Sequence, residues 1–146
     1  MNQLVTLACP QCDAGNRFAA EKLDANPRCG KCNAPLFSGA PLDLSTERFK
    51  QHLKLTSLPI VVDFWAPWCG PCKAMAPSFH AAAERLEPNF RLIKINTEME
   101  NALASEFRIQ SIPTLMLIQD AQVIGRESGA MNTGQLMQWL ASLAQA

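Results

Sequence analysis

The sequence has no excess of charge of either sign. Its 146 residues include 13 Lys and Arg and 13 Asp and Glu, so the formal net charge is zero. Clustered positive charge is what attracts nucleic acids and anionic membrane surfaces. The balance therefore predicts that neither is a partner.

Long hydrophobic runs are also missing. Apolar stretches such as LMLI at 115–118 are far shorter than the roughly 20 residues that a membrane-spanning helix needs. The first residues, MNQLVTLACPQC, have neither the basic stretch nor the small-residue cleavage site of a secretion signal. We therefore expect a cytoplasmic protein, in a compartment that keeps thiols reduced.

Large apolar residues are scarce in residues 1–37, which hold four of the six cysteines. A segment of this size cannot bury enough apolar surface to offset its ordering entropy unless a bound metal or disulfides stabilise it. Ser-Gly-Ala-Pro at 38–41 supplies turn-forming residues. We expect a small domain at 1–37, a linker at 38–41 and a main domain at 42–146.

Every cysteine belongs to a pair separated by two residues, and the first two pairs favour a metal site. CPQC and CGKC give the spacing C-x₂-C-x₁₆-C-x₂-C, which is typical of structural zinc. Each pair is followed by Asx-Ala, which suits a tight turn whose backbone N–H groups point at the sulfurs. We predict one zinc ion bound by Cys9, Cys12, Cys29 and Cys32 in a tetrahedral shell. Two disulfides, four free thiols, or a ribbon that binds nucleic acid remain the alternatives.

The main domain alternates strands and helices. IVVDFW after Pro59, RLIKIN at 91–96, and the pair LMLIQ and QVIGR at 115–119 and 122–126 are predicted strands, the last two forming a hairpin. Ser45 and Thr133 are candidate helix caps, and Met75, Phe79, Ala82 and Leu86 form a helical stripe. The order β-α-β-α-β-α-β-β-α predicts an α/β domain with a buried sheet covered by helices.

The third cysteine pair joins a buried strand to the start of a helix. Pro71 suits a first helical turn, and a cysteine at a helix N-terminus is favoured as a thiolate. Cys69 is thus predicted to be an activated, accessible thiolate, with Cys72 one turn further on and within reach. A lone pair cannot close a tetrahedral metal shell, so this pair is predicted to be redox-active.

DFWAPWCGPCK, followed by Pro77 and by SIPT at 111–114, resembles the thioredoxin family, and the preceding four cysteines resemble its zinc-containing thioredoxin 2 subgroup. The resemblance covers about residues 42–146 and implies a thioredoxin fold, a central mixed sheet flanked by helices, beside a Cys₄ zinc ribbon. It implies a general protein disulfide reductase in which Cys69 attacks a target disulfide and Cys72 resolves the mixed disulfide. An NADPH-dependent thioredoxin reductase would restore the dithiol, without a bound organic cofactor, in a monomer.

Asp63 interrupts the apolar run of its strand, where an ionised carboxylate is costly. Burial raises the pKa of a carboxyl, which lets it accept a proton near neutral pH. The resemblance implies that Asp63 takes the proton from Cys72 and that Lys94 modulates it. A satisfied core acid and a solvated strand lysine are the alternatives.

The resemblance also implies a docking surface for extended target segments. Ile112-Pro113 matches the family's cis-proline loop, which presents backbone to the target as in strand addition. Trp68, Gly70, Pro71 and Gly129 complete the patch. His52 and His80 are isolated in the sequence, and we expect both at the surface.

Two other functions fit parts of the sequence. The ribbon could be a partner-binding module with secondary redox activity, and the zinc site could be structural or redox-responsive. A disulfide oxidase or isomerase is disfavoured by the Gly-Pro between the cysteines and by the missing secretion signal.

Overall fold

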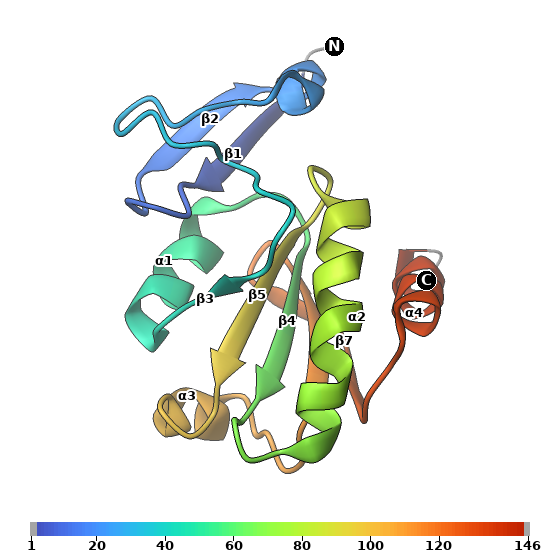
Figure 1. The fold of residues 1–146 in the computed structure, drawn as a ribbon. Coiled ribbons are helices and arrows are strands. Elements are labelled where there is room, and N and C mark those ends of the chain that lie inside the picture. The colour runs from blue at the N-terminus through green and yellow to red at the C-terminus, as the bar shows by residue number, and fades with distance from the viewer. Residues whose placement is uncertain (1–2, 145–146) are drawn as a thin grey trace.

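The computed structural model of the chain describes residues 3–144. Its N-terminal part, residues 3–37, is a small ribbon at one end of a larger α/β domain (Figure 1). The ribbon contains β1 (Leu4–Ala8), β2 (Gly15–Ala19) and the 3₁₀ helix η1 (Ala20–Ala25). β1 and β2 pair antiparallel.

The α/β domain has the predicted order of strands and helices. Its elements are β3 (Leu42–Asp43), α1 (Thr46–Leu55), β4 (Ile60–Trp65), α2 (Gly70–Leu86), β5 (Arg91–Asn96), α3 (Asn101–Glu106), β6 (Thr114–Gln119), β7 (Gln122–Ser128) and α4 (Thr133–Ala144). The sheet order is β3-β5-β4-β6-β7. β3, β5 and β4 run parallel, whereas β6 and β7 are antiparallel to their neighbours. The sheet is therefore mixed, as expected.

Alternating side chains of the central strand β4 face two separate cores. Val61 packs with α2 and α4, whereas Ile60, Val62 and Phe64 pack with α1 and α3. Successive residues of a strand point to opposite faces, so Asp63 shares the α2 face with Val61. A buried acid thus lies beneath the helix that carries Cys72.

Local sequence signals set where two helices begin. Ser45 caps α1, its hydroxyl accepting from the Arg48 N–H at 3.3 Å. α2 begins directly after Cys69, with Pro71 in its first turn, and contains Pro77. Because β4 ends at Trp65, only a short loop separates the strand from the cysteine pair.

The ribbon is fixed to α1 through Asp13. The Asp13 carboxylate accepts two hydrogen bonds of 2.9 Å from the Arg48 guanidinium and one of 2.8 Å from His52 Nε2, and Arg48 also donates to Pro10 O. His52 is fully buried, so the expectation of a surface histidine is wrong at this position. Its burial follows from packing of the ribbon on α1. His80 is exposed, as expected.

A buried ion pair fixes the segment that joins ribbon and domain. Arg91 donates to Glu87 at 3.0 Å and to Leu36 O at 2.7 Å, and its guanidinium lies 4.9 Å from the ring centre of Phe37. Glu87 also accepts from Gly39 N–H at 2.8 Å. These hydrogen bonds tie residues 36–39 to the domain.

No helix within residues 3–144 is both long enough and apolar enough to cross a membrane. This agrees with the short apolar runs of the sequence.

Candidate redox centre and metal site

Cys69 and Cys72 lie at the N-terminus of α2 and are joined by a disulfide. Cys69 is the N-cap residue, and its sulfur accepts from the Cys72 N–H at 3.2 Å. The free N–H groups and the dipole of a helix N-terminus stabilise negative charge. If the disulfide is reduced, the same position favours the Cys69 thiolate.

Both cysteines of the pair are buried. Cys69 is only 5% exposed in this disulfide form, and the accessible thiolate of the reduced protein stays a prediction. Trp65, Ala66 and Ile112 pack around the two cysteines. The Cys69 sulfur lies 3.8 Å from Ile112 O.

Asp63 is 1% exposed, and neither carboxylate oxygen has a hydrogen-bond partner among residues 3–144. Burial raises the pKa of Asp63 to about 7, although the positive charge of Lys94 opposes the rise. A carboxyl group with this pKa can gain or lose a proton at neutral pH.

Lys94 is the cation placed to affect this carboxyl. Lys94 on β5 is the register partner of Asp63 on the parallel strand β4. Its Nζ lies 4.5 Å from the ring centre of Trp65. Its charge lowers the pKa of Asp63. The structure thus brings Lys94 close to both Asp63 and Trp65, and Trp65 also packs on the cysteine pair.

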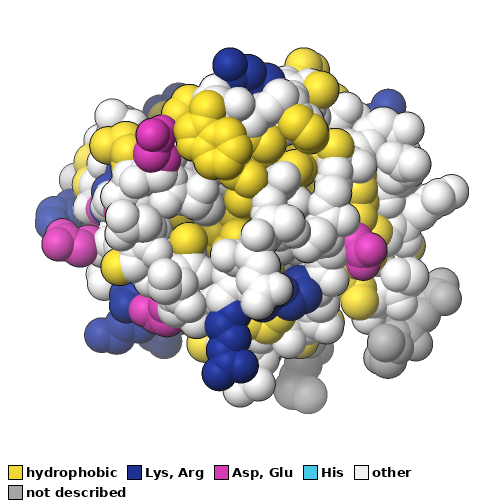
Figure 2. Space-filling model, turned by 90° about the horizontal axis from the view of Figure 1, so that it is seen from below, with side chains coloured by type: hydrophobic (Ala, Val, Ile, Leu, Met, Phe, Trp, Pro, Cys, Tyr) yellow, Lys and Arg dark blue, Asp and Glu magenta, His cyan; other side chains and the backbone are white. Residues whose placement is uncertain are grey.

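The predicted docking residues lie around the cysteines on the end of the domain where β4 terminates. Trp68 is 68% exposed, and Gly70, Pro71 and Gly129 are exposed as well. The Ile112–Pro113 peptide bond is cis, as the resemblance implied; a second cis bond, Glu87–Pro88, was not foreseen. Figure 2 views this end and shows hydrophobic side chains gathered on it.

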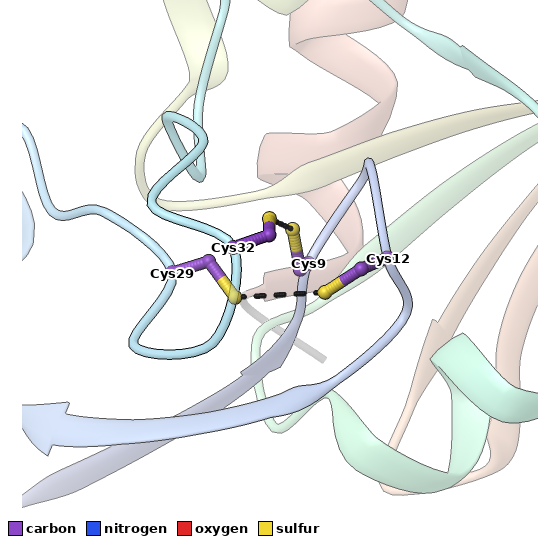
Figure 3. A group of neighbouring side chains, drawn as sticks. All are labelled: Cys9, Cys12, Cys29 and Cys32. Atoms are coloured by element: carbon purple, nitrogen blue, oxygen red, sulfur yellow. Dashed lines mark hydrogen bonds between the residues drawn. The ribbon is translucent and has the colours of Figure 1, made fainter.

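The other four cysteines converge from two turns of the ribbon (Figure 3). Each turn has the same hydrogen bonds: Cys9 N–H to Ala14 O with Asp13 N–H to Cys9 O, and Cys29 N–H to Ala34 O with Asn33 N–H to Cys29 O. Asp13 and Asn33 both adopt a positive φ, of 64° and 65°. Asp and Asn tolerate this conformation better than most residues, which explains the Asx after each pair.

The four sulfurs fit a zinc ion. They all lie within 4.8 Å of one another, with 3.6 Å between Cys9 and Cys32 and 3.7 Å between Cys12 and Cys29. A tetrahedron with Zn–S bonds of about 2.3 Å has sulfurs about 3.8 Å apart. N–H groups of Gln11 and Lys31 donate to Cys9 and Cys29 at 3.3 Å, as the turns predicted.

Hydrogen bonds stabilise negative charge on one of these sulfurs, that of Cys29. Backbone N–H donation from Cys32, a side-chain hydrogen bond from Asn16 and the Lys31 N–H lower the pKa of Cys29 to about 6. Zinc binds the thiolate form of cysteine. Asn16, which sequence reasoning missed, also accepts from Gly30 N–H at 2.9 Å, so it links β2 to the second turn.

The two sulfur sites lie at opposite ends of the α/β domain. The ribbon sits at the end where β4 and β5 begin, and the cysteine pair follows the end of β4 (Figure 1). The ribbon sulfurs are therefore not placed to take part in exchange at Cys69.

Two family models match the chain. The model described as Thioredoxin matches residues 40–142, and the model described as Thioredoxin 2, N-terminal, matches residues 8–34. The first covers the α/β domain, and the second contains all four ribbon cysteines.

Curated relatives and a solved structure agree with these matches. Thioredoxin C-3 of Corynebacterium nephridii is 40% identical over 134 residues, 92% of each chain, a span too long to lie in the α/β domain alone. Thioredoxin 1 of Synechococcus elongatus is 42% identical over 57% of this chain and 78% of its own. A crystal structure of chloroplastic thioredoxin z superposes with a TM-score of 0.66 at 25% identity, over 73% of this chain and 96% of that one.

Proposed function

The chain belongs to the thioredoxin family and is a thiol–disulfide oxidoreductase, and we propose that Cys69 and Cys72 are the pair that reduces disulfides of other proteins. The observation that carries this proposal is the position of both cysteines at one helix N-terminus, with the Cys69 sulfur 3.8 Å from the carbonyl of Ile112 and the buried Asp63 on the sheet face that α2 covers. The four ribbon cysteines would bind the metal, which leaves Cys69 and Cys72 to alternate between dithiol and disulfide.

The reaction proceeds in two exchanges. The Cys69 thiolate attacks one sulfur of the target disulfide; that S–S bond breaks, a mixed disulfide forms, and the other target sulfur leaves as a thiolate. Cys72 then attacks the Cys69 sulfur, and the second target sulfur leaves. Two electrons pass to the target, and the chain is left with the Cys69–Cys72 disulfide.

Asp63 accepts the proton that Cys72 must lose before it attacks. Its burial and a pKa of about 7 support this role, since a carboxyl held near neutrality can both take and release the proton. The proton then passes to the departing target thiolate. Lys94 acts through Asp63 as a positioning charge, not on the sulfurs.

The surface around the cysteines holds the target. Trp68 offers exposed apolar area, Ile112 offers a backbone carbonyl, and Gly70, Pro71, Pro113 and Gly129 border the approach. An extended segment can pair with the loop at Ile112 by strand addition. Because this pairing uses hydrogen bonds to the target's backbone, it tolerates many target sequences. This supports a general reductase instead of an enzyme with one substrate.

Zinc completes the ribbon. Cys9, Cys12, Cys29 and Cys32 would hold the ion, and its chemistry there is structural, because a closed Cys₄ shell leaves no open position. The ribbon's own core is small, so the ion supplies stability that packing cannot. An NADPH-dependent reductase is the proposed electron donor, in the reducing environment of the cytoplasm.

Trapping variants test the assignment of the two cysteines. Cys72→Ser removes the resolving thiol, so mixed disulfides between Cys69 and target proteins should accumulate on non-reducing gels. Cys69→Ser should trap none and should lose insulin reduction in the presence of dithiothreitol. The reverse pattern would show that the roles are exchanged.

A further inference from the structure

A groove of about 470 Å³ lies beside the docking surface, between the end of β7, the loop at 129–131 and one side of α4. Its walls include Glu127, Gly129, Met131, Gln138 and Trp139. The reaction described above does not use these residues, Gly129 excepted.

The groove continues directly from the place where the target is held. Gly129 N–H donates to Pro113 O at 2.9 Å, and the neighbouring Ile112 carbonyl lies 3.8 Å from the Cys69 sulfur. A polypeptide paired with the loop at Ile112 therefore passes the mouth of the groove within a few residues of its disulfide.

The groove is already formed in the protein without a target. Met131 N–H lies 3.4 Å from the Met75 sulfur, and the Thr133 hydroxyl donates to Ser78 O at 3.2 Å, so α2 holds the C-terminal end of the loop. The hydrogen bond from Gly129 N–H to Pro113 O holds its start. Gly129 has φ +106°, a conformation that side-chain-bearing residues rarely adopt. A fixed groove can select a side chain without first ordering itself.

The lining is mostly polar, with one unpaired acid, and its large apolar side chains are Met131 and Trp139. Glu127 is the charged residue of the groove, is exposed, and forms no ion pair within residues 3–144. Gln138 has no side-chain hydrogen bond within this range, and Trp139 and Met131 are half-buried against the core of α2 and α4.

Resting on the proposed function, we propose that this groove binds a lysine or arginine side chain of the target polypeptide, close in sequence to the disulfide being reduced. The aliphatic part of such a side chain lies along Trp139 and Met131, as long cationic residues do on apolar surface. Its charged end reaches the Glu127 carboxylate and the Gln138 amide oxygen. The groove thus adds a charge preference to backbone-directed docking.

Peptide substrates test this preference. Each peptide carries one cysteine in a disulfide with a small thiol, and a single Lys or Glu is moved through the four positions on either side of that cysteine. At low ionic strength, kcat/KM should favour Lys over Glu by about two- to five-fold, the size of an exposed ion pair, at one or two positions on one side only.

Variants place the effect in the groove. Glu127→Gln should abolish the preference and Glu127→Lys should reverse it, whereas Glu21→Gln, on the ribbon and equal in charge change, should keep it. A Lys preference that is absent, or that survives in Glu127→Gln, overturns the proposal while peptide reduction continues. Failure to reduce any peptide overturns the proposed function itself, and the groove proposal with it.

Discussion

At the scale of single residues, Asp63 has the clearest consequence for stability. The folded protein keeps a proton on Asp63 up to a pKa of about 7, whereas an ordinary aspartate loses it near 4. Folding therefore takes up a proton between these pH values. Raising the pH through this window destabilises the protein through Asp63, and above about pH 7 the destabilisation is complete.

Asp63→Asn should remove this pH dependence. Relative to wild type, the free energy of unfolding of Asp63→Asn should rise by on the order of 4 kcal/mol between pH 4 and pH 8, the equivalent of the pKa difference. Denaturant unfolding at a series of pH values measures it. Resolution of the mixed disulfide by Cys72 should slow at neutral pH. If the difference in free energy of unfolding between Asp63→Asn and wild type does not change with pH, Asp63 has the pKa of an ordinary aspartate.

The chemistry of single residues was predictable where it depends on a short stretch of neighbouring sequence. The cysteine spacing, the Asx after each ribbon pair and the acid inside an apolar strand each predict a local environment that the structure contains. The buried His52 and Arg91 were missed because their partners, Asp13 and Leu36, lie 39 and 55 residues away. Only the docking of ribbon on domain brings them together.

At the scale of elements, two side chains of α1, Arg48 and His52, hold the ribbon through Asp13, and Arg48 makes most of the hydrogen bonds. Arg48→Ala removes the paired hydrogen bonds to Asp13 and the one to Pro10 O. We expect a loss of about 1–2 kcal/mol in the free energy of unfolding, because the pair is charged but Arg48 is partly exposed. Amide hydrogen exchange should speed up at the turn around Asp13.

Lys50→Ala on the same helix is the matched control. Lys50 pairs with Glu106 far out in solvent, both side chains being more than half exposed. Its loss should cost less than about 1 kcal/mol and leave exchange in the ribbon unchanged. Equal effects of the two variants would show that Arg48 does not hold the ribbon.

The junction of α2 and β5 depends on a fully enclosed ion pair. Arg91→Met leaves Glu87 buried without its cation and removes the donor to Leu36 O. We therefore expect the free energy of unfolding to fall by about 3–5 kcal/mol, as measured by thermal or denaturant unfolding. Adding Glu87→Gln should recover part of it, because the uncompensated charge disappears. Arg91→Met as stable as wild type would refute a structural role for the pair.

Elements were easier to predict than their connections. The predicted order of strands and helices matches the α/β domain, and hydrophobic patterns located the strands at 60–65, 91–96 and 115–119, which are mostly buried. The two-residue strand β3 has no such pattern. The segment at 38–41 is predicted to be a linker because Gly and Pro mark turns, and its composition did not predict that Glu87 holds Gly39. Turn-forming composition indicates a bend in the chain and carries no information about what holds it.

At the scale of the whole molecule, the four-cysteine ribbon and the Cys69–Cys72 pair lie at opposite ends of the α/β domain. Removing zinc with a chelator should loosen the ribbon and lower the melting temperature. The rate at which the reduced protein cleaves a small disulfide should stay within about twofold, because the cysteine pair lies at the far end of the sheet. A large loss of rate on metal removal, reversed by zinc, would mean that the two ends are coupled.

The central claim is that four sulfurs hold an ion while two exchange electrons. Zinc content and disulfide position, measured by elemental analysis and peptide mass mapping before and after mild oxidation, test it most directly. We predict one zinc per chain in both states, with a Cys69–Cys72 bridge only after oxidation. Absence of zinc from the purified protein, or a bridge involving Cys9, Cys12, Cys29 or Cys32 after mild oxidation, would contradict it.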